Sequence, residues 1–222
     1  MRDIHLRPGR PLLAVSARPW AGVLLACCTI VVAGFGVLFA HQATADWFDR
    51  AVDAPVITWL GGRQGLAHWL IAPGSPIPAA VLSAAIAAAC LLTGRLNGAV
   101  LAVVAIAATD GLVEGVLKPL VHRTYLGNLV YPSGHTATVF ALAATVTVLL
   151  LIPPRPAEAR VLRILIPSVG CAAGIMVAIT LIGLQWHYFT DTVAGAAVGI
   201  GTVCGLALIL DRPAIRRWLR IA

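Results

Sequence analysis

The sequence predicts an all-α protein that crosses a membrane six times. The first observation is the composition: of 222 residues, 59% are hydrophobic and 11% are charged, and the mean hydropathy is +0.91. A soluble domain carries about a quarter charged residues. The second observation is a series of apolar runs near the ~20 residues that span a bilayer as a helix. Ala, Val, Leu and Gly dominate these runs, which favours packed helices over a β-barrel.

The six apolar runs lie at residues 19–41, 77–93, 97–117, 136–153, 164–184 and 190–210. The second run is short, and a tight turn with Arg95 and Asn97 separates it from the third. Residues 42–76 contain several prolines, glycines and tryptophans, which argue against another span and predict an outer interfacial segment with aromatic anchors. No internal repeat interrupts the chain, so we expect a single domain over residues 1–222.

The basic residues alternate between loops in a way that predicts the orientation. With six spans, twelve arginines fall on the side of the two termini, which include the basic segments 1–18 and 211–222. The other side receives four basic residues, Arg50, Arg63, Lys118 and Arg123. Because positively charged loops stay in the cytoplasm, both termini are expected inside. No basic tract resembles a nucleic-acid arm, so the formal charge of +7 does not indicate a nucleic-acid partner.

The five cysteines all lie in apolar runs, without a CxxC pair or a nearby histidine. We interpret them as buried, inert thiols and expect neither a disulfide nor a metal site. The first apolar run lacks a convincing small-residue cleavage site, so we expect it to be retained as a span and not removed as a signal peptide.

Two outer loops, between spans three and four and between spans five and six, carry polar groups suited to a phosphate ester. They contain Lys118, Arg123, Ser133, Gly134, His135, His187 and Asp191. Lysine and arginine neutralise phosphate oxygens, the lysine as a point charge and the arginine as a planar fork. Ser133 and Gly134 precede an apolar helix, whose first N–H groups favour an anion, and glycine lets the backbone approach closely.

His187 and Asp191 are four residues apart, so a helical turn would place them on one face. The carboxylate would then hold the imidazole tautomer and leave the other nitrogen free to attack phosphorus. His135 is the candidate general acid for the leaving oxygen. The alternative for this loop is an aromatic belt in which Asp191 or Thr190 only caps the last span.

Other charged residues near this loop have simpler explanations. Lys118, the single lysine of the chain, is also explained as a snorkelling side chain at a helix end. Asp110 and Glu114 precede it in span three, where acidic residues are functional candidates. We favour instead their pairing with Lys118, with Arg123 or with a neighbouring helix. His122 is expected to be a loop residue.

These residues resemble the type 2 phosphatidic acid phosphatase superfamily, the membrane lipid phosphatases related to vanadium haloperoxidases. The family has three motifs, Lys-x6-Arg-Pro, Pro-Ser-Gly-His and Ser-Arg-x5-His-x3-Asp. The second motif is complete at residues 132–135, and the third retains His187 and Asp191. The resemblance implies that His187 forms a phosphohistidine with the help of Asp191, while His135 protonates the leaving alcohol. It also implies that Lys118, Arg123, Ser133 and Gly134 hold the phosphate oxygens, without a metal or another cofactor.

The chain departs from the family at both motif arginines. The Arg-Pro of the first motif falls on Tyr125 and Leu126, and Arg123 stands two residues earlier, where many members carry an additional arginine. The Ser-Arg of the third motif falls on Thr180 and Leu181, so that arginine is missing. Arg50 or Arg63, in the outer segment between spans one and two, is a candidate to replace the missing cation.

We therefore expect an integral protein of a bacterial plasma membrane that hydrolyses a lipid phosphate at the outer face. Candidate substrates are polyprenyl phosphates or diphosphates, phosphatidic acid, phosphatidylglycerol phosphate and lipid-linked sugar phosphates. The alternatives are a phosphotransferase of the same fold and a non-catalytic lipid-phosphate binder or transporter. Besides membrane lipids, a second copy of the chain is a candidate partner, because Gly195 and Gly199 form a G-x-x-x-G spacing. The same spacing equally suits packing within one chain.

Overall fold

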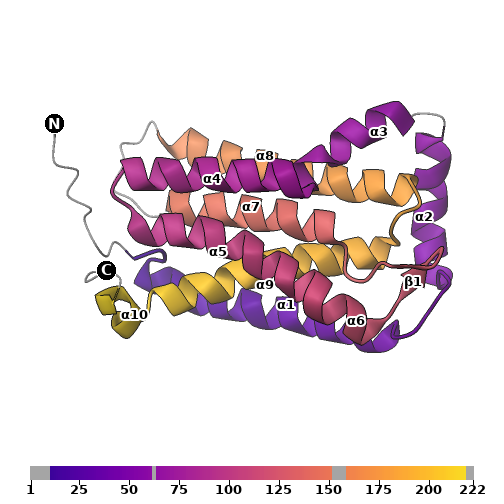
Figure 1. Ribbon diagram of the computed structural model, residues 1–222, viewed down its shortest axis with the longest axis horizontal. Coiled ribbons are helices and arrows are strands. Elements are labelled where there is room, and N and C mark those ends of the chain that lie inside the picture. Colours follow the sequence, from indigo (N-terminus) through magenta and orange to yellow (C-terminus); the bar gives the residue numbers. More distant parts are fainter. Residues whose placement is uncertain (1–10, 62–63, 152–158, 219–222) are drawn as a thin grey trace.

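The computed structural model describes residues 11–61, 64–151 and 159–218, and it confirms the all-α fold class (Figure 1). Within these ranges, five helical segments are long and apolar enough to cross a membrane. They are Val15–Leu38, Leu96–Val121, Gly134–Leu151, Val161–Gly183 and Phe189–Leu210. These segments contain the helices α1 (Arg18–Leu38), α5 (Leu96–Leu112), α7 (Gly134–Leu151), α8 (Ala159–Gly183) and α9 (Phe189–Leu210).

The expected second span corresponds to α4 (Pro76–Leu92), which qualifies as a sixth span together with the helical residues before it. Those residues, Ala67–Gly74, meet α4 at a bend of 47°. Pro73, Pro76 and Pro78 surround this bend, and a proline ring prevents the regular continuation of a helix. Five of the six predicted spans thus have a matching long apolar helix among the described residues, and the sixth has one when the bent pair is counted as one broken span.

The third span runs further than the sequence predicts. After α5 the chain makes a π-helical turn, η3 (Val113–Leu117), and a last short helix, α6 (Lys118–Val121). His122 ends α6 in the left-handed backbone conformation, with φ of 51°. Such π-helical turns occur frequently at functional sites, and this one lies directly before Lys118.

The described part of residues 42–76 forms two short helices, α2 (Trp47–Leu60) and α3 (Gln64–Ile71), followed by the turn η2 (Ala72–Gly74). The Asp46 carboxylate caps α2 by accepting a hydrogen bond from the Asp49 backbone N–H at 2.7 Å. Helix α2 lies across one end of the bundle, where it contacts α8 and α9 (Figure 1). The segment therefore closes that end of the bundle.

A small hairpin connects α6 to α7 at the same end (Figure 1). Strands β1 (Thr124–Tyr125) and β2 (Asn128–Leu129) pair antiparallel, with Thr124 opposite Leu129. Leu126 and Gly127 form the two-residue turn with φ of 48° and 81°, as a tight hairpin requires. The Thr124 N–H donates to the Gln42 carbonyl at 2.9 Å, which ties the hairpin to the chain between α1 and α2.

The closest helix packing is between α7 and α9. A Cβ on Gly195 would overlap the carbonyl oxygen of Ser133, and one on Gly199 would overlap that of Ala137. Both glycines therefore serve packing within the chain, which was one of the two explanations for their spacing. Their contact fixes the start of α7 against the start of α9.

The opposite end of the bundle carries the first and last described segments (Figure 1). There the buried Asp211 carboxylate accepts hydrogen bonds from the backbone N–H groups of Leu12 and Leu13 at 2.7 and 2.9 Å. Arg18 lies 3.4 Å from the same carboxylate. The cytoplasmic position of this end stays a prediction, as does the role of residues 1–10 and 219–222, which lie outside the described ranges.

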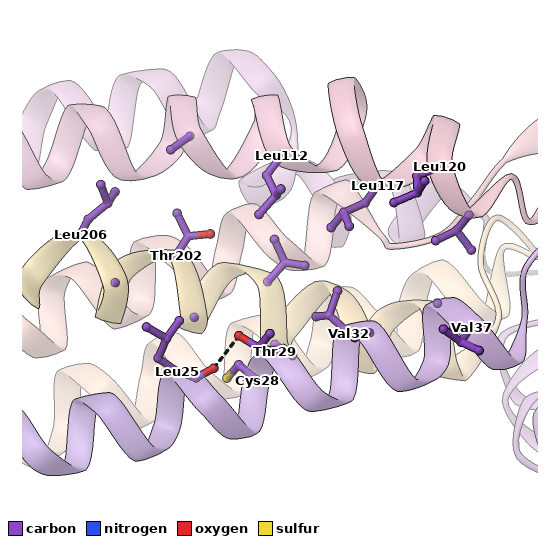
Figure 2. A pocket seen from close by; sticks show the side chains of 18 of the residues that line it. Leu25, Cys28, Thr29, Val32, Val37, Leu112, Leu117, Leu120, Thr202 and Leu206 are labelled. Carbon is purple, nitrogen blue, oxygen red and sulfur yellow. Dashed lines mark hydrogen bonds between the residues drawn. The ribbon is translucent and has the colours of Figure 1, made fainter. Parts of the chain in front are cut away.

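An apolar cavity of about 860 Å³ lies between α1, α9 and the α5–α6 segment (Figure 2). Its lining includes Leu25, Val32, Leu112, Leu117 and Leu206, and neither His135 nor His187 belongs to it. The cavity is thus distinct from the site built by the two polar loops.

Candidate functional site

The structure brings the two predicted loops together at the end of the bundle that α2 covers. The Ser133 N–H donates to the Asp191 carbonyl at 3.0 Å, which joins the start of α7 to the first turn of α9. The Ser133 hydroxyl is buried and shares a hydrogen bond with the Thr136 hydroxyl at 3.1 Å. Ser133 therefore serves as a local cap for α7 in this structure, and its contact with a phosphate stays a prediction.

His187 lies in a bend before α9 and not in the helical turn that the spacing suggested, but it is still close to Asp191 in the first turn of α9. His187 Nδ1 is 3.9 Å from Asp191 Oδ2, which exceeds a hydrogen-bond distance. That oxygen accepts instead from the Tyr188 N–H at 3.0 Å, which caps α9. His187 is 9% exposed, and its Nδ1 has no hydrogen-bond partner among the described residues. Catalytic hydrogen bonds are often long before substrate binds, so this geometry leaves the predicted pair within reach.

Arg123 is fully buried and bound by two carboxylates. Its Nη1 donates to Asp191 Oδ1 at 2.6 Å and to the Thr190 hydroxyl at 2.7 Å. Its Nη2 donates to Asp49 Oδ2 at 2.5 Å. The guanidinium also lies over the Phe39 ring at 4.2 Å. Burial alone would lower the pKa of Arg123, but Asp191 and Asp49 offset it and raise that pKa.

These contacts differ from the role that the sequence suggested for Arg123. Both of its terminal nitrogens donate within the protein, whereas its Nε has no hydrogen-bond partner among the described residues. A direct contact between Arg123 and phosphate stays a prediction. What the structure shows is that Arg123 fixes the position of Asp191 beside His187.

Two further carboxylates, Asp49 and Asp53 on α2, were not predicted as part of the site. Asp49 accepts from the Thr190 N–H and the Thr190 hydroxyl, both at 3.0 Å, besides its bond with Arg123. Asp53 accepts from the Phe189 N–H at 3.1 Å, so both carboxylates bind the first turn of α9. Asp49 and Asp53 are four residues apart and follow the capping residue Asp46, a pattern that predicts a helix. The same pattern also fits the solvent-exposed face of a helix, so it does not by itself indicate a site.

The environment of Asp53 favours its neutral form. Burial and the neighbouring Asp49 charge raise the pKa of Asp53 to about 7, despite the hydrogen bond from Phe189. Asp53 lines a pocket of about 440 Å³ together with Arg50, Tyr125, Gln185 and His187. Arg50 therefore shares a pocket with the candidate nucleophile, and its role as a substitute cation stays a prediction, whereas Arg63 lies outside the described residues.

Lys118 makes one ion pair, with Glu114. Lys118 Nζ lies 2.7 Å from Glu114 Oε1, one turn earlier in the π-helical segment. Asp110 accepts a hydrogen bond from the Thr138 hydroxyl of α7 at 3.1 Å. The interpretation of these two acidic residues as partners of Lys118 and of a neighbouring helix is confirmed. His122 is a loop residue whose ring lies 5.8 Å from that of His41.

His135 lies in the first turn of α7, between the two loops. Its ring centroid is 6.3 Å from that of Trp186, the residue before His187. Its main chain contacts η2 so closely that a Cβ on Gly74 would lie 2.7 Å from the His135 carbonyl oxygen. Gly134 opens the other side of this turn, where its nearest neighbour is the Glu114 carboxylate. The imidazole pair and the helix start therefore lie in one region.

The positions of the two lost motif arginines have different surroundings. Leu181 is completely buried and packs with Ile71, Val139 and Val177 in an apolar cluster. Tyr125 packs against Tyr188 with ring centroids 4.7 Å apart and the ring planes tilted by 57°. Apolar packing has replaced one cation and an aromatic contact the other. Among the described residues, no three His, Cys, Asp or Glu side chains converge as a metal-ligand set.

Comparison with known families identifies the chain. The model of the PAP2 superfamily matches residues 99–214, more than half of the chain, from α5 to the start of α10 (Pro213–Trp218). Neither a curated protein nor a solved structure matches the chain. The matched region contains both polar loops and the four helices that carry them, and the chain belongs to the PAP2 superfamily of type 2 phosphatidic acid phosphatases.

Proposed function

We propose that the protein is an integral membrane lipid phosphatase that forms a phosphohistidine at His187. The observation that carries this proposal is the junction of the two loops, which brings His187 and Asp191 beside the Ser133–His135 start of α7. Membership of the PAP2 superfamily supports a phosphatase type of activity. Five or six apolar helices support a membrane-embedded enzyme.

In the first chemical step a nitrogen of His187 attacks the phosphorus of a lipid phosphate, and the bond from phosphorus to the lipid oxygen breaks. His135 gives a proton to that oxygen, so the lipid leaves as an alcohol. In the second step water attacks the phosphohistidine, its proton passes to His135, and inorganic phosphate leaves. Lys118 and the first N–H groups of α7 would neutralise the charge that spreads over the phosphate oxygens.

Asp191 would stabilise the positive charge that His187 develops during attack. The present gap of 3.9 Å between His187 Nδ1 and Asp191 Oδ2 requires a shift of about 1 Å to form a hydrogen bond. Arg123 holds Asp191 from the opposite side, so the imidazole is the group expected to move. In this proposal Arg123 is a positioning residue unless a phosphate displaces one of its carboxylates.

The active site would face the outside of a bacterial plasma membrane. Arg18 and Asp211 lie at the end of the bundle that the basic loops predict to be cytoplasmic. The candidate site lies at the opposite end (Figure 1). The candidate substrates remain polyprenyl phosphates or diphosphates, phosphatidic acid, phosphatidylglycerol phosphate and lipid-linked sugar phosphates.

The test is phosphate release from this panel of lipids by the purified protein in detergent, with a metal chelator present. Release that disappears in His187→Ala and persists in His122→Asn would support the proposal. Asparagine tolerates the left-handed backbone of position 122, so this variant is a matched control in a neighbouring loop. Transfer of phosphate to an added lipid acceptor, without release into water, would favour the phosphotransferase instead.

A non-catalytic binder is the second candidate, and the replacement of both motif arginines favours it. With Tyr125 and Leu181 at these positions, fewer cations remain to stabilise a phosphoryl transition state. Binding of lipid phosphates without any release or transfer would support this candidate. Loss of this binding in Lys118→Ala would place the bound lipid phosphate beside Lys118, in the site described above.

A further inference from the structure

Glu114 occupies the corner of the site where a phosphate is expected. Its Oε1 lies 2.7 Å from Lys118 Nζ. The same oxygen would lie 3.0 Å from a Cβ on Gly134, so it reaches the start of α7. A carboxylate oxygen thus already stands between the lysine ammonium and the glycine that opens the helix. A phosphate that enters this corner must displace it.

The charges around the two loops do not favour a doubly negative ligand. Two cations, Lys118 and Arg123, face three carboxylates, Asp49, Asp191 and Glu114. Arg123 is completely buried and bound to Asp49 and Asp191, so Lys118 is the more accessible of the two cations for a substrate. Asp53 adds a titratable carboxyl group and Arg50 a cation in the neighbouring pocket, whose lining does not include Lys118. A phosphate dianion would therefore enter a region in which Glu114 repels it.

A substrate that carries its own ammonium group would resolve this conflict. The ammonium would bind the Glu114 carboxylate, and Lys118 would be released to bind the phosphate. One ion pair is exchanged for two, and no carboxylate is left beside the phosphate without a partner. Glu114 has the freedom to turn toward such a group, because its side chain is 59% exposed, whereas that of Lys118 is 17% exposed.

We propose that Glu114 is a specificity-determining residue that selects lipid phosphates bearing an ammonium group close to the phosphate. This inference rests on the proposed function and adds a preferred substrate class, lipid phosphates with zwitterionic head groups, to the candidates given above. Glu114 is not assigned a part in bond breaking; it decides which phosphate can take Lys118 from its present partner.

The experiment compares two substrates that differ only in this ammonium group, sphingosine 1-phosphate and its N-acetyl derivative. We expect the wild-type protein to prefer the free amine by about three- to fivefold in kcat/KM, the upper part of the range for an exposed ion pair. Glu114→Gln should reduce the preference to less than about twofold, mainly because the N-acetyl substrate improves. Asp46→Asn, which removes one negative charge elsewhere at this end and keeps the α2 cap, should retain the preference.

Equal kcat/KM for the two lipids in the wild-type protein would overturn the inference and leave the phosphatase proposal intact. The reverse case is tested by binding of the same two lipids to His187→Ala, with and without Glu114→Gln. If no lipid is hydrolysed but the difference in Kd depends on Glu114, the inference stands and the phosphatase proposal fails. If the Kd values are equal in both backgrounds, the inference fails regardless of activity. Thermal unfolding of each variant in detergent confirms that it is folded.

Discussion

The two basic residues of the site illustrate two different uses of a positive charge. Arg123 is completely buried, and both of its terminal nitrogens donate to protein groups, namely Asp49, Thr190 and Asp191. Lys118 is partly accessible and has one exposed partner, Glu114, on its own helical segment. A buried ion pair resists change because the loss of one partner leaves an unpaired charge, whereas an exposed pair exchanges readily.

This difference assigns separate tasks to the two residues. The Arg123 cluster, defined as Arg123, Asp49, Thr190 and Asp191, joins the α6–α7 loop, α2 and α9 into one unit. The Lys118 corner, defined as Lys118, Glu114 and Gly134, is the part that a substrate would enter in the proposed reaction. Substitutions in the cluster should therefore affect folding first, and substitutions in the corner should affect ligand binding.

Arg123→Ala should have the largest effect. It leaves the buried Asp49 and Asp191 carboxylates without a cation, which typically destabilises a protein by about 3–5 kcal/mol. The measurement is reversible unfolding of the detergent-solubilised protein. Arg123→Lys should recover part of the loss, because the charge returns without the planar fork. A stability within about 0.5 kcal/mol of wild type in Arg123→Ala would show that the cluster does not hold the fold.

Asp49→Asn should cost less, about 2–3 kcal/mol, because Arg123 keeps Asp191 while it loses one charged partner. The asparagine oxygen can still accept from the Thr190 N–H, so the start of α9 keeps its cap. Activity should fall with stability, since Arg123 and Asp191 would be less well fixed. An unchanged unfolding midpoint in Asp49→Asn would show that Asp49 of α2 does not contribute to the stability of the cluster.

Asp53 makes a pH-dependent contribution with a defined sign. Its folded-state pKa, near 7, is higher than the ordinary value of 3.8, so the folded protein binds this proton more tightly than the unfolded chain. The stability it contributes is present below about pH 4 and is lost as the pH rises through 7. We expect the free energy of unfolding to decrease between pH 4 and 8, and we expect this decrease to be absent in Asp53→Asn. The same slope in both proteins would contradict this assignment.

Lys118→Ala should have the smallest effect on folding and a large effect on function. Its ion pair with Glu114 is partly exposed and contributes less than about 1 kcal/mol. Loss of the cation beside the phosphate should lower kcat/KM by about 10²-fold. Parallel measurements of unfolding and phosphate release would establish the contrast with Arg123→Ala. If Lys118→Ala unfolds like Arg123→Ala, the two regions do not differ as proposed.

Much of the architecture was predictable because apolar runs of bilayer length and turn residues are local signals. The helix class, the spans and the junction of the two polar loops at one end follow from such signals. The π-helical turn before Lys118 and the extension of the third span to Val121 were not predictable, because no residue type marks them. The bend before α4 had a signal in its prolines, but its angle depends on packing.

The Arg123 cluster could not be predicted because it depends on where α2 docks. From the sequence, Asp49 and Asp53 look like the solvated face of an amphipathic helix, and Arg123 looks like a free cation in an outer loop. Only the contact of α2 with the α9 start brings Asp49 within 2.5 Å of Arg123. The loss of the third-motif arginine was visible in the sequence, whereas the apolar packing around Leu181 was not.

The most direct test of the account is detection of the phosphohistidine itself. The protein would be mixed with a radiolabelled lipid phosphate that it hydrolyses, quenched in alkali, and digested for mass spectrometry. The account predicts an alkali-stable, acid-labile phosphate on His187 that is absent from His187→Ala and retained in His122→Asn. Phosphate release without label on His187, or a label that persists in His187→Ala, would contradict it.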